Sequence, residues 1–471
     1  MKRGDELEIT LESFAFEGKS LARVEGMVLF VRGAMPGDRA RVRLVTVKKS
    51  YAEGTAVEIL APSPLRTAPR CRHFGVCGGC RWQDVSYEAQ LEFKRQHVLD
   101  ALERIGNFRG VAVAPTLGAV RPFYYRNKME FSFGRKWLTR EELELRSPEE
   151  SRDASQTDWA LGLHIAGRFD RVLDLDECYL QSETSVAIVN AVRRFCRARS
   201  LDYYSTFTHR GYLRNLVIRE SRTTGEVMVN LVTSAERPDL VADFCGALLA
   251  EVPAVTTICN NITDRKSQVA VGDREIVCHG AGTITERIGR RTYRISANSF
   301  FQTNTDQAER LYDTARRMAA LTPADVVYDC YSGIGTIALH VADAVARVIG
   351  IESVPAAVDD AVRNAAANGV GNCHFILGDL RETLLRSREH LEEWGRPTVM
   401  IIDPPRAGMH EDVIRRVLEL APERIVYVSC NPATQARDLR LLGPAYGIRE
   451  VQPVDMFPHT YHIENVVALS R

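Results

Sequence analysis

The chain has 471 residues, of which 45% are hydrophobic. This length is too great for one compact core and predicts two or three folded domains. Lys and Arg number 61, as do Asp and Glu, and this balance excludes a uniformly basic protein but not local basic patches. The sequence shows neither the apolar core of a secretory signal nor an apolar run long enough to span a membrane. We therefore expect a cytoplasmic protein whose eleven cysteines are thiols, catalysts or metal ligands.

Residues 1–60 are expected to form a small antiparallel β-barrel. Short runs of alternating apolar and polar residues, such as GMVLFVRG and DRARVRLVTVKK, are separated by glycines. Basic residues gather on the last of these runs, where they fit a solvated strand face as well as a binding surface. They are Arg41, Arg43, Lys48 and Lys49.

Residues 61–290 are expected to form a central α+β domain that opens with a cysteine cluster. Cys71, Cys77 and Cys80 lie within ten residues, and the glycines between them let the loop wrap an ion, so the spacing indicates a metal site. Four thiolates suit either zinc or an iron–sulfur cluster, and the spacing does not separate the two. The candidates for a fourth ligand are Cys178, Cys196, Cys245, Cys259 and Cys278.

The rest of this block mixes one helical pattern with strands. Apolar residues at three- and four-residue spacing predict a helix over 86–106, and residues 138–160 have the composition of a surface insertion. The segment 121–128 interleaves Arg and Lys with aromatic residues, which suits contacts to phosphates and stacking on bases. Arg126 and Lys128 are its candidate RNA ligands, whereas its aromatic residues fit a core role equally well.

Residues 291–471 are expected to form an α/β domain with a Rossmann-like, mostly parallel sheet. Apolar strands alternate with helical stretches, as in VVYDCY followed by GTIALHVADA. A glycine turn, Gly333-Ile334-Gly335, ends the first strand, and Glu352 ends the second. The turn and the carboxylate each fit any nucleotide cofactor, a dinucleotide included. The fourth strand ends in Asp403-Pro404-Pro405-Arg406, which would hold a polar group rigidly, although two prolines also simply end buried strands.

A thiol lies at the end of the next strand, in Ser429-Cys430-Asn431-Pro432, and a histidine-rich segment closes the chain. At this point the sequence resembles the RNA uracil-5-methyltransferases, whose motifs it matches in order across the catalytic half. The N-terminal barrel resembles the family's TRAM domain, and the cysteine cluster resembles that of its ribosomal-RNA branch. The matching motifs are SFFQTN (299–304), DCYSGIGT (329–336), DPPR (403–406), SCNP (429–432) and DMFPHTYHIE (455–464).

The resemblance implies methyl transfer from S-adenosylmethionine to carbon 5 of a uridine in structured RNA, with 23S ribosomal RNA as the favoured target. Cys430 would add to carbon 6, Glu464 would remove the carbon 5 proton, and Asp403 would bind the uracil edge. Since the thiol must ionise, we expect an electropositive site aided by Arg406, which is also a candidate RNA ligand. The implied cofactor contacts are Gln302, Tyr331, Gly333, Gly335, Thr336, Glu352, Asp379 and Asp403, with Thr336 replacing the Asn of some members.

The resemblance also implies a [4Fe–4S] cluster of architectural role, held by Cys71, Cys77, Cys80 and Cys178. His459 and His462 would suit a metal only on a helix, which Pro458 disfavours, so substrate or structural roles are expected for them. The expected partner is RNA, with neither DNA nor membrane, and the protein is expected to be a monomer.

Several alternatives stay open at this level. A transfer-RNA uracil-5-methyltransferase would use the same mechanism on another substrate. An adenine-N6 methyltransferase would share the fold but needs no thiol nucleophile, and its proline loop normally ends in an aromatic residue where this chain has Arg406. An NAD(P)-linked oxidoreductase would explain the glycine turn but not Cys430. An RNA-binding protein with an inactive methyltransferase domain would not need intact Cys430, Glu464 and Asp403.

Overall fold

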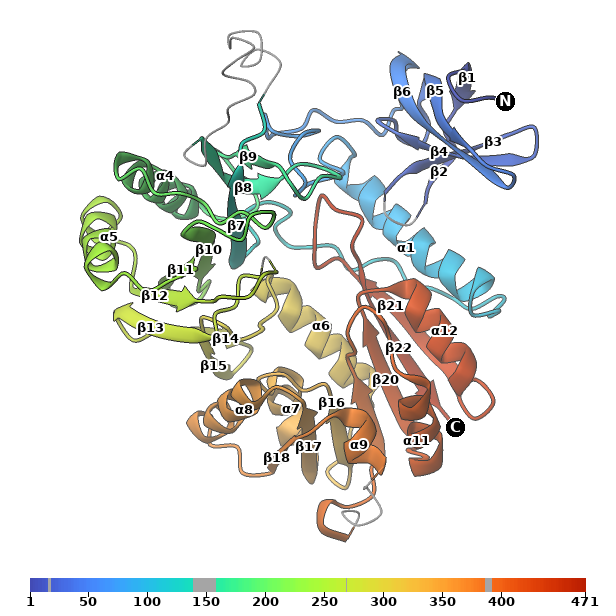
Figure 1. The fold of residues 1–471 in the computed structure, drawn as a ribbon. Helices are drawn as coiled ribbons and strands as arrows, with labels where there is room; N and C mark the ends of the chain where they lie inside the picture. The colour runs from blue at the N-terminus through green and yellow to red at the C-terminus, as the bar shows by residue number, and fades with distance from the viewer. Residues whose placement is uncertain (16–17, 139–157, 268, 386–391) are drawn as a thin grey trace.

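The computed structural model describes residues 1–15, 18–138, 158–267, 269–385 and 392–471 (Figure 1). The stretch predicted as a surface insertion, 138–160, lies almost wholly outside the described residues. The N-terminal part, hereafter the barrel, is a six-stranded sheet of order β1-β5-β6-β4-β3-β2. Its β4 and β6 pair in parallel, so the predicted antiparallel arrangement is wrong at this pair. Its strands are β1 (Glu6–Thr10), β2 (Ser13–Phe14), β3 (Ser20–Val24), β4 (Met27–Arg32), β5 (Arg39–Val47) and β6 (Tyr51–Ala61).

Alternation along these strands separates an apolar interior from a charged exterior. Side chains such as Leu29 are fully buried in the small core of this sheet. The arginines of β5 point outward and pair across strands, Arg43 with Glu6 at 2.8 Å and Arg41 with Glu58 at 2.6 Å. Exposed pairs of this kind contribute little to stability. At Arg41 and Arg43 the basic cluster is therefore a solvated strand face.

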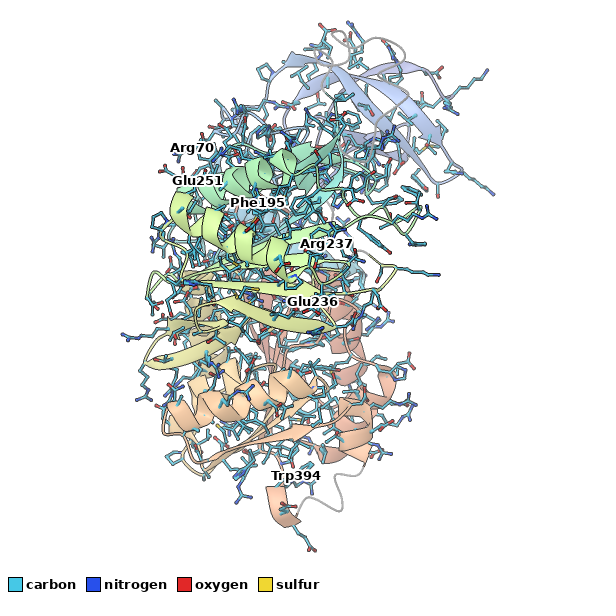
Figure 2. The ribbon with its side chains drawn as sticks, turned by 60° about the vertical axis from the view of Figure 1, so that its left-hand side comes forward. Arg70, Phe195, Glu236, Arg237, Glu251 and Trp394 are labelled. Atoms are coloured by element: carbon cyan, nitrogen blue, oxygen red, sulfur yellow. The ribbon has the colours of Figure 1, made fainter. Side chains whose placement is uncertain are left out.

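The central part is built on a seven-stranded sheet of order β13-β12-β11-β10-β7-β8-β9. Helices α4 and α5 lie together on it (Figures 1 and 2), where Phe195 packs edge-on against Phe244 with 5.4 Å between ring centroids. The elements are β7 (Lys128–Arg135), β8 (Trp159–His164), β9 (Val172–Asp174), α4 (Glu183–Ala198), β10 (Leu213–Glu220), β11 (Val227–Thr233), α5 (Pro238–Glu251), β12 (Thr257–Ile262) and β13 (Arg274–His279).

The C-terminal part is a second seven-stranded sheet, of order β18-β17-β16-β19-β20-β22-β21. Its strands are β16 (Val326–Cys330), β17 (Arg347–Glu352), β18 (Cys373–Leu377), β19 (Val399–Ile402), β20 (Arg424–Ser429), β21 (Gly447–Val454) and β22 (Glu464–Ser470). The first five are parallel, and β22 runs antiparallel to both β20 and β21.

Helices cover both faces of this sheet, as the strand–helix alternation predicted. One face carries α6 (Thr305–Met318), α7 (Thr336–Val341), which continues into the 3-10 turn η1 (Ala342–Ala344), and α8 (Pro355–Ala367). The other carries α9 (Leu380–Leu385), α11 (Glu411–Leu420) and α12 (Pro432–Leu442).

Two segments of the predicted central block pack against the C-terminal part. Helix α1 (Tyr87–Arg104) lies against α12 and buries Val98 and Leu102 in the same core (Figure 1). The hairpin β14 (Thr283–Ile288)–β15 (Arg291–Ser296) joins the core formed by α6 and α7. This hairpin spans the predicted division at residue 290. In the described part of the chain, no helix is both long and apolar enough to cross a membrane.

Candidate active site

Strand direction brings the sequence-predicted residues to one edge of the C-terminal sheet. Parallel strands β16 to β20 end together, so Tyr331, Glu352, Asp379, Asp403 and Cys430 follow their carboxyl ends. Strand β22 runs antiparallel to β20, with Ser429 opposite Asn465. The first residue of β22 therefore lies at the edge where β20 ends. The register therefore places Glu464 beside Cys430, although 34 positions separate them in the sequence numbering.

The predicted cofactor turn has the backbone that its glycines allow. Gly333 and Gly335 take positive φ values of 54° and 81°, and Gly335 is the N-cap of α7. A Cβ on Gly335 would meet the Phe375 ring at 2.8 Å, so only glycine fits this turn. The Gly333 N–H donates to Glu352 Oε2 at 2.9 Å, which fixes the carboxylate at the end of β17 beside the turn.

The remaining predicted cofactor residues surround the same turn. Tyr331 precedes it with φ 67°, and burial raises the pKa of its phenol. Thr336 is the first residue of α7, and its carbonyl accepts a hydrogen bond from the Tyr293 hydroxyl at 3.2 Å. Asp379 accepts from the Arg381 N–H at 2.9 Å and so caps α9. Gln302 is buried at the start of α6.

The thiol of Cys430 lies among charged groups. Burial raises its pKa to about 11, with Glu464 and Asp403 adding to the rise and Arg406 opposing it through its charge and a hydrogen bond. Burial of the thiol is the largest cause, so the free protein does not show the predicted site that favours the thiolate, although Arg406 acts in the predicted direction. The thiol of the free protein is therefore protonated at neutral pH.

Of the two carboxyls next to Cys430, Glu464 is buried and Asp403 is half-buried. Burial raises the pKa of Asp403 to about 7. Burial, followed by the charge of Asp403, raises the pKa of Glu464 well above its usual value, while Arg406 lowers it. Two carboxylates in one buried site repel each other, so the pair retains a proton near neutral pH.

The segment before Glu464 is anchored by a network that the sequence did not reveal. Lys94 Nζ on α1 donates to Asp455 Oδ1 at 2.5 Å and to the Phe457 carbonyl at 3.0 Å. Both charged side chains are completely buried. Tyr87 also donates to Asp455, at 2.8 Å. The only sequence signal was Lys94 on the apolar stripe of a predicted helix.

The two histidines of this segment are neutral and differently placed. His459 is buried and stacks on Phe123 with 4.2 Å between ring centroids, and burial lowers its pKa to about 4. His462 lies 3.5 Å from Arg406, and burial together with that charge lowers its pKa to about 4. His459 therefore has a packing role, and His462 lies beside Arg406.

The cysteine loop is docked directly on this segment. The Arg81 and Trp82 N–H groups donate to the His459 carbonyl at 2.8 and 3.0 Å. Cys71, Cys77, Cys80 and Cys178 line one cavity of about 20 Å³, together with apolar side chains. Even so, among the described residues no three His, Cys, Asp or Glu side chains are placed to hold a metal ion, so the predicted metal centre is not supported as a preformed ion site.

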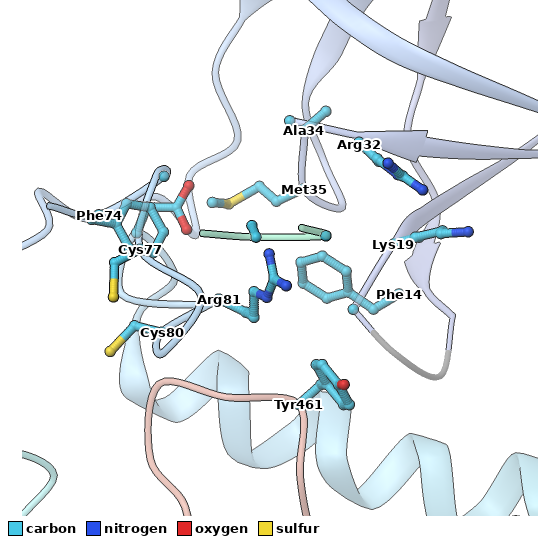
Figure 3. Close-up of a pocket in the computed structure, with 16 residues that line it drawn as sticks. Phe14, Lys19, Arg32, Ala34, Met35, Phe74, Cys77, Cys80, Arg81 and Tyr461 are labelled. Carbon is cyan, nitrogen blue, oxygen red and sulfur yellow. The ribbon is translucent and has the colours of Figure 1, made fainter. Parts of the chain in front are cut away.

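A larger cavity, of about 720 Å³, separates the barrel from the cysteine loop (Figure 3). Tyr461, which lies three residues before Glu464 in the chain, lines one side of it. Lys19, Arg32 and Arg81 line it, and Lys19 pairs with Glu53 at 2.8 Å. Its surface thus combines cations with aromatic rings, a combination typical of single-stranded nucleic-acid sites.

The predicted RNA ligands of segment 121–128 lie beside the cysteine loop. Arg126 and Lys128 line a cavity of about 240 Å³ next to Gly79. Lys128 pairs with Glu130 at 2.5 Å, and Arg126 lies over the Phe457 ring. The aromatic residues of the segment pack against Arg70 (labelled in Figure 2) and Tyr179, with Arg70 4.4 Å from the Tyr179 ring centre.

Comparison with known proteins agrees with this arrangement. Residues 280–471 match the family model of tRNA (uracil-5-)-methyltransferases, and residues 1–57 match that of the TRAM domain. An uncharacterized RNA methyltransferase of Chlorobaculum tepidum is 44% identical over 100% of this chain and 97% of its own length. One of Porphyromonas gingivalis is 45% identical over 99% of both chains.

Among solved structures, the tRNA (uracil-54, C5)-methyltransferase of Pyrococcus abyssi, crystallised with S-adenosyl-L-homocysteine, is 30% identical to this chain. The match covers 98% of this chain and 99% of that one, with a TM-score of 0.74. The barrel, the sheet edge and these matches lead to one conclusion. The chain belongs to the S-adenosylmethionine-dependent RNA uracil-5-methyltransferase family.

Proposed function

We propose that this enzyme methylates carbon 5 of a uridine in structured RNA through a covalent bond between Cys430 and carbon 6 of the base. The observation that carries the proposal is the register of β20 and β22, which sets the thiol beside Glu464 at the cofactor edge of the sheet. Neither an adenine-N6 methyltransferase nor an oxidoreductase has a use for that pair.

The proposed reaction divides one difficult alkylation into easier steps. The Cys430 thiolate bonds to carbon 6, and the resulting enolate attacks the methyl carbon through carbon 5, releasing S-adenosylhomocysteine. Unprotonated Glu464 then accepts the carbon 5 proton, the carbon 6–sulfur bond breaks, and the thiolate leaves. Asp403 would hydrogen-bond the uracil edge in the same buried site.

The raised pKa values set a condition on these steps. Burial raises the pKa of both Cys430 and Glu464 in the free protein and so favours their protonated forms, yet each must lose its proton to act. Arg406 is the group that lowers both pKa values, so we assign to it the ionisation of the site.

The target uridine must leave its stack, since carbon 6 is covered in a paired helix. We propose 23S ribosomal RNA as the substrate, held along the cavity between barrel and cysteine loop. The second candidate is transfer RNA, which is favoured by the similarity to the Pyrococcus abyssi tRNA (uracil-54, C5)-methyltransferase.

Methyl transfer from radiolabelled S-adenosylmethionine to each purified RNA, followed by mapping of the product, decides between the two. The proposal expects label in 5-methyluridine of 23S RNA, absent with Cys430→Ala and retained with Cys373→Ala. Label in transfer RNA alone would transfer the assignment to the second candidate, and label on another base would reject the reaction.

We further propose that Cys71, Cys77, Cys80 and Cys178 hold a [4Fe–4S] cluster of architectural role. Support comes from their convergence on one cavity with apolar walls, whereas Cys196 and Cys259 lie buried elsewhere. The cavity has room for about one water molecule, so the glycine-rich loop would have to open around a cluster. Iron and labile sulfide should be found in protein purified without oxygen and lost with Cys178→Ala but not Cys196→Ala. Zinc in their place would contradict the cluster.

A further inference from the structure

Two phenylalanine side chains of the central domain project into solvent. Phe169, in the turn between β8 and β9, is 75% exposed, and Phe207, in the loop before β10, is 73% exposed. Leaving two large rings in water forgoes the free energy that burial would give. Exposed aromatic groups that gather at one place mark a binding surface.

The two rings lie close together and are inclined to each other. Their centroids are 6.5 Å apart, and their planes are inclined by 31°. Two successive stacking spacings of about 3.4 Å add up to about 6.8 Å. The centroid separation is close to this sum, so rotation of the two exposed side chains can admit one flat aromatic ring between them with the three planes parallel.

The surroundings of the rings favour an anion. Both rings line a cavity of about 490 Å³, which suits a small ligand, and Arg135 and Arg171 line it as well. Asp170 pairs with Arg171 at 3.2 Å and with Arg168 at 3.3 Å, whereas none of the described acidic side chains pairs with Arg135. Burial and then the charge of Arg135 lower the pKa of Arg171, as expected for neighbouring cations.

A buried polar atom at the same cavity also lacks a partner. His164 lines the cavity, and its Nδ1 finds no hydrogen-bond partner among the described residues. These features match the parts of a nucleotide. The aromatic rings suit its base, the arginines suit its phosphate, and the unused imidazole nitrogen suits its sugar or base edge.

The turn that carries Phe169 is attached to the cysteine loop. The Ala166 N–H donates to the Val76 carbonyl at 3.1 Å, and Ile165 bridges to Cys77. Ala166 and Gly167 also line the 720 Å³ cavity that Tyr461 lines. One short turn thus separates that cavity from the two rings, so a single RNA strand can reach both.

We propose that Phe169 and Phe207 sandwich one unpaired base of the RNA substrate, while Arg135 and Arg171 hold its phosphates. This inference rests on the proposed function, because it assigns a second contact to the same RNA. The site recognises an unstacked nucleotide outside the target uridine, and it adds affinity without touching the reacting atoms.

The test uses a single-stranded RNA of twelve adenylates that contains one 2-aminopurine, whose fluorescence falls when the base stacks. Wild-type protein should bind and quench it. Phe169→Ala and Phe207→Ala should each weaken binding about 5- to 100-fold and reduce the quenching. Phe207→Tyr, which keeps the ring, should retain both, as should Val277→Ala, an exposed residue of the same sheet. Wild-type affinity and quenching in the double alanine variant would overturn the proposal.

A methylation assay separates this inference from the proposed function. In the double alanine variant, KM for the RNA substrate should rise by the same factor as Kd, with kcat unchanged at saturating RNA. If wild-type protein quenches the oligonucleotide but methylates no uridine, the reaction is wrong and the base site stands. If methylation is normal but the alanine variants leave KM and Kd unchanged, the base site alone is wrong.

Discussion

The Lys94–Asp455 pair is the structural link between helix α1 and the catalytic edge, and Lys94→Met tests it. The substitution keeps the length of the side chain but leaves a buried carboxylate without its counter-charge. Loss of one partner of a buried pair costs about 3–5 kcal/mol. In a unit of roughly 200 residues, each kcal/mol corresponds to about 2–4 °C, so Tm should fall by about 10 °C.

The same substitution should also slow the reaction. Lys94 fixes the Phe457 carbonyl as well as Asp455, and that segment runs directly into Glu464. We expect kcat to fall at least tenfold at a temperature where the variant is folded, with an unchanged Kd for S-adenosylmethionine, because the cofactor turn lies on β16 and β17. Circular dichroism, steady-state kinetics and calorimetry measure the three quantities.

A matched control and a second variant make this prediction refutable. Arg104→Met removes an exposed pair from the same helix and should cost less than about 1 kcal/mol. Lys94→Met combined with Asp455→Asn removes both charges and should recover part of the lost stability. A folded Lys94→Met protein with wild-type kcat and a Tm within 2–4 °C of wild type, about 1 kcal/mol, would refute the positioning role.

Three further outcomes follow from the charges at the reactive edge. Because the pKa of Cys430 is about 11, the thiolate fraction grows about tenfold per pH unit below that value. The rate of single-turnover adduct formation should therefore rise steeply between about pH 6.5 and 9. A flat profile would show that ionisation does not limit the step. Glu464→Gln should form the RNA adduct but fail to release it, which denaturing gels detect; normal turnover would remove Glu464 from its role as base. Arg406→Ala should raise the pKa of Cys430 further and slow adduct formation near pH 7.5, with recovery at higher pH; an equal loss at every pH would indicate an RNA contact only.

The reactive edge was predictable because strand–helix alternation implies parallel strands, whose carboxyl ends meet at one edge of the sheet. Parallel strands place Glu352, Asp403 and Cys430 at one edge whatever their side chains contact. The glycine turn was also predictable, since only glycine tolerates the backbone at Gly335. These features depend on local pattern and on a rule of topology.

The rest depends on contacts between distant parts of the chain. Lys94 meets Asp455 only because α1 packs against the C-terminal sheet, and the helical pattern alone does not choose between packing partners. The raised pKa of Cys430 reflects first the burial of the thiol and then the charges of Glu464 and Asp403, which no spacing in the sequence reveals. Phe169 and Phe207 lie in separate loops of ordinary composition, so their pairing was invisible in the sequence.

The central claim is the covalent bond between Cys430 and the target base, and one trapping experiment tests it most directly. The protein and S-adenosylmethionine are incubated with total RNA in which 5-fluorouridine replaces uridine, and the mixture is resolved under denaturing conditions. Fluorine cannot leave as a proton, so the account predicts a stable RNA–protein adduct that maps to Cys430 and is absent with Cys430→Ala. No adduct from protein that binds S-adenosylmethionine normally, or an adduct that survives Cys430→Ala, would contradict it.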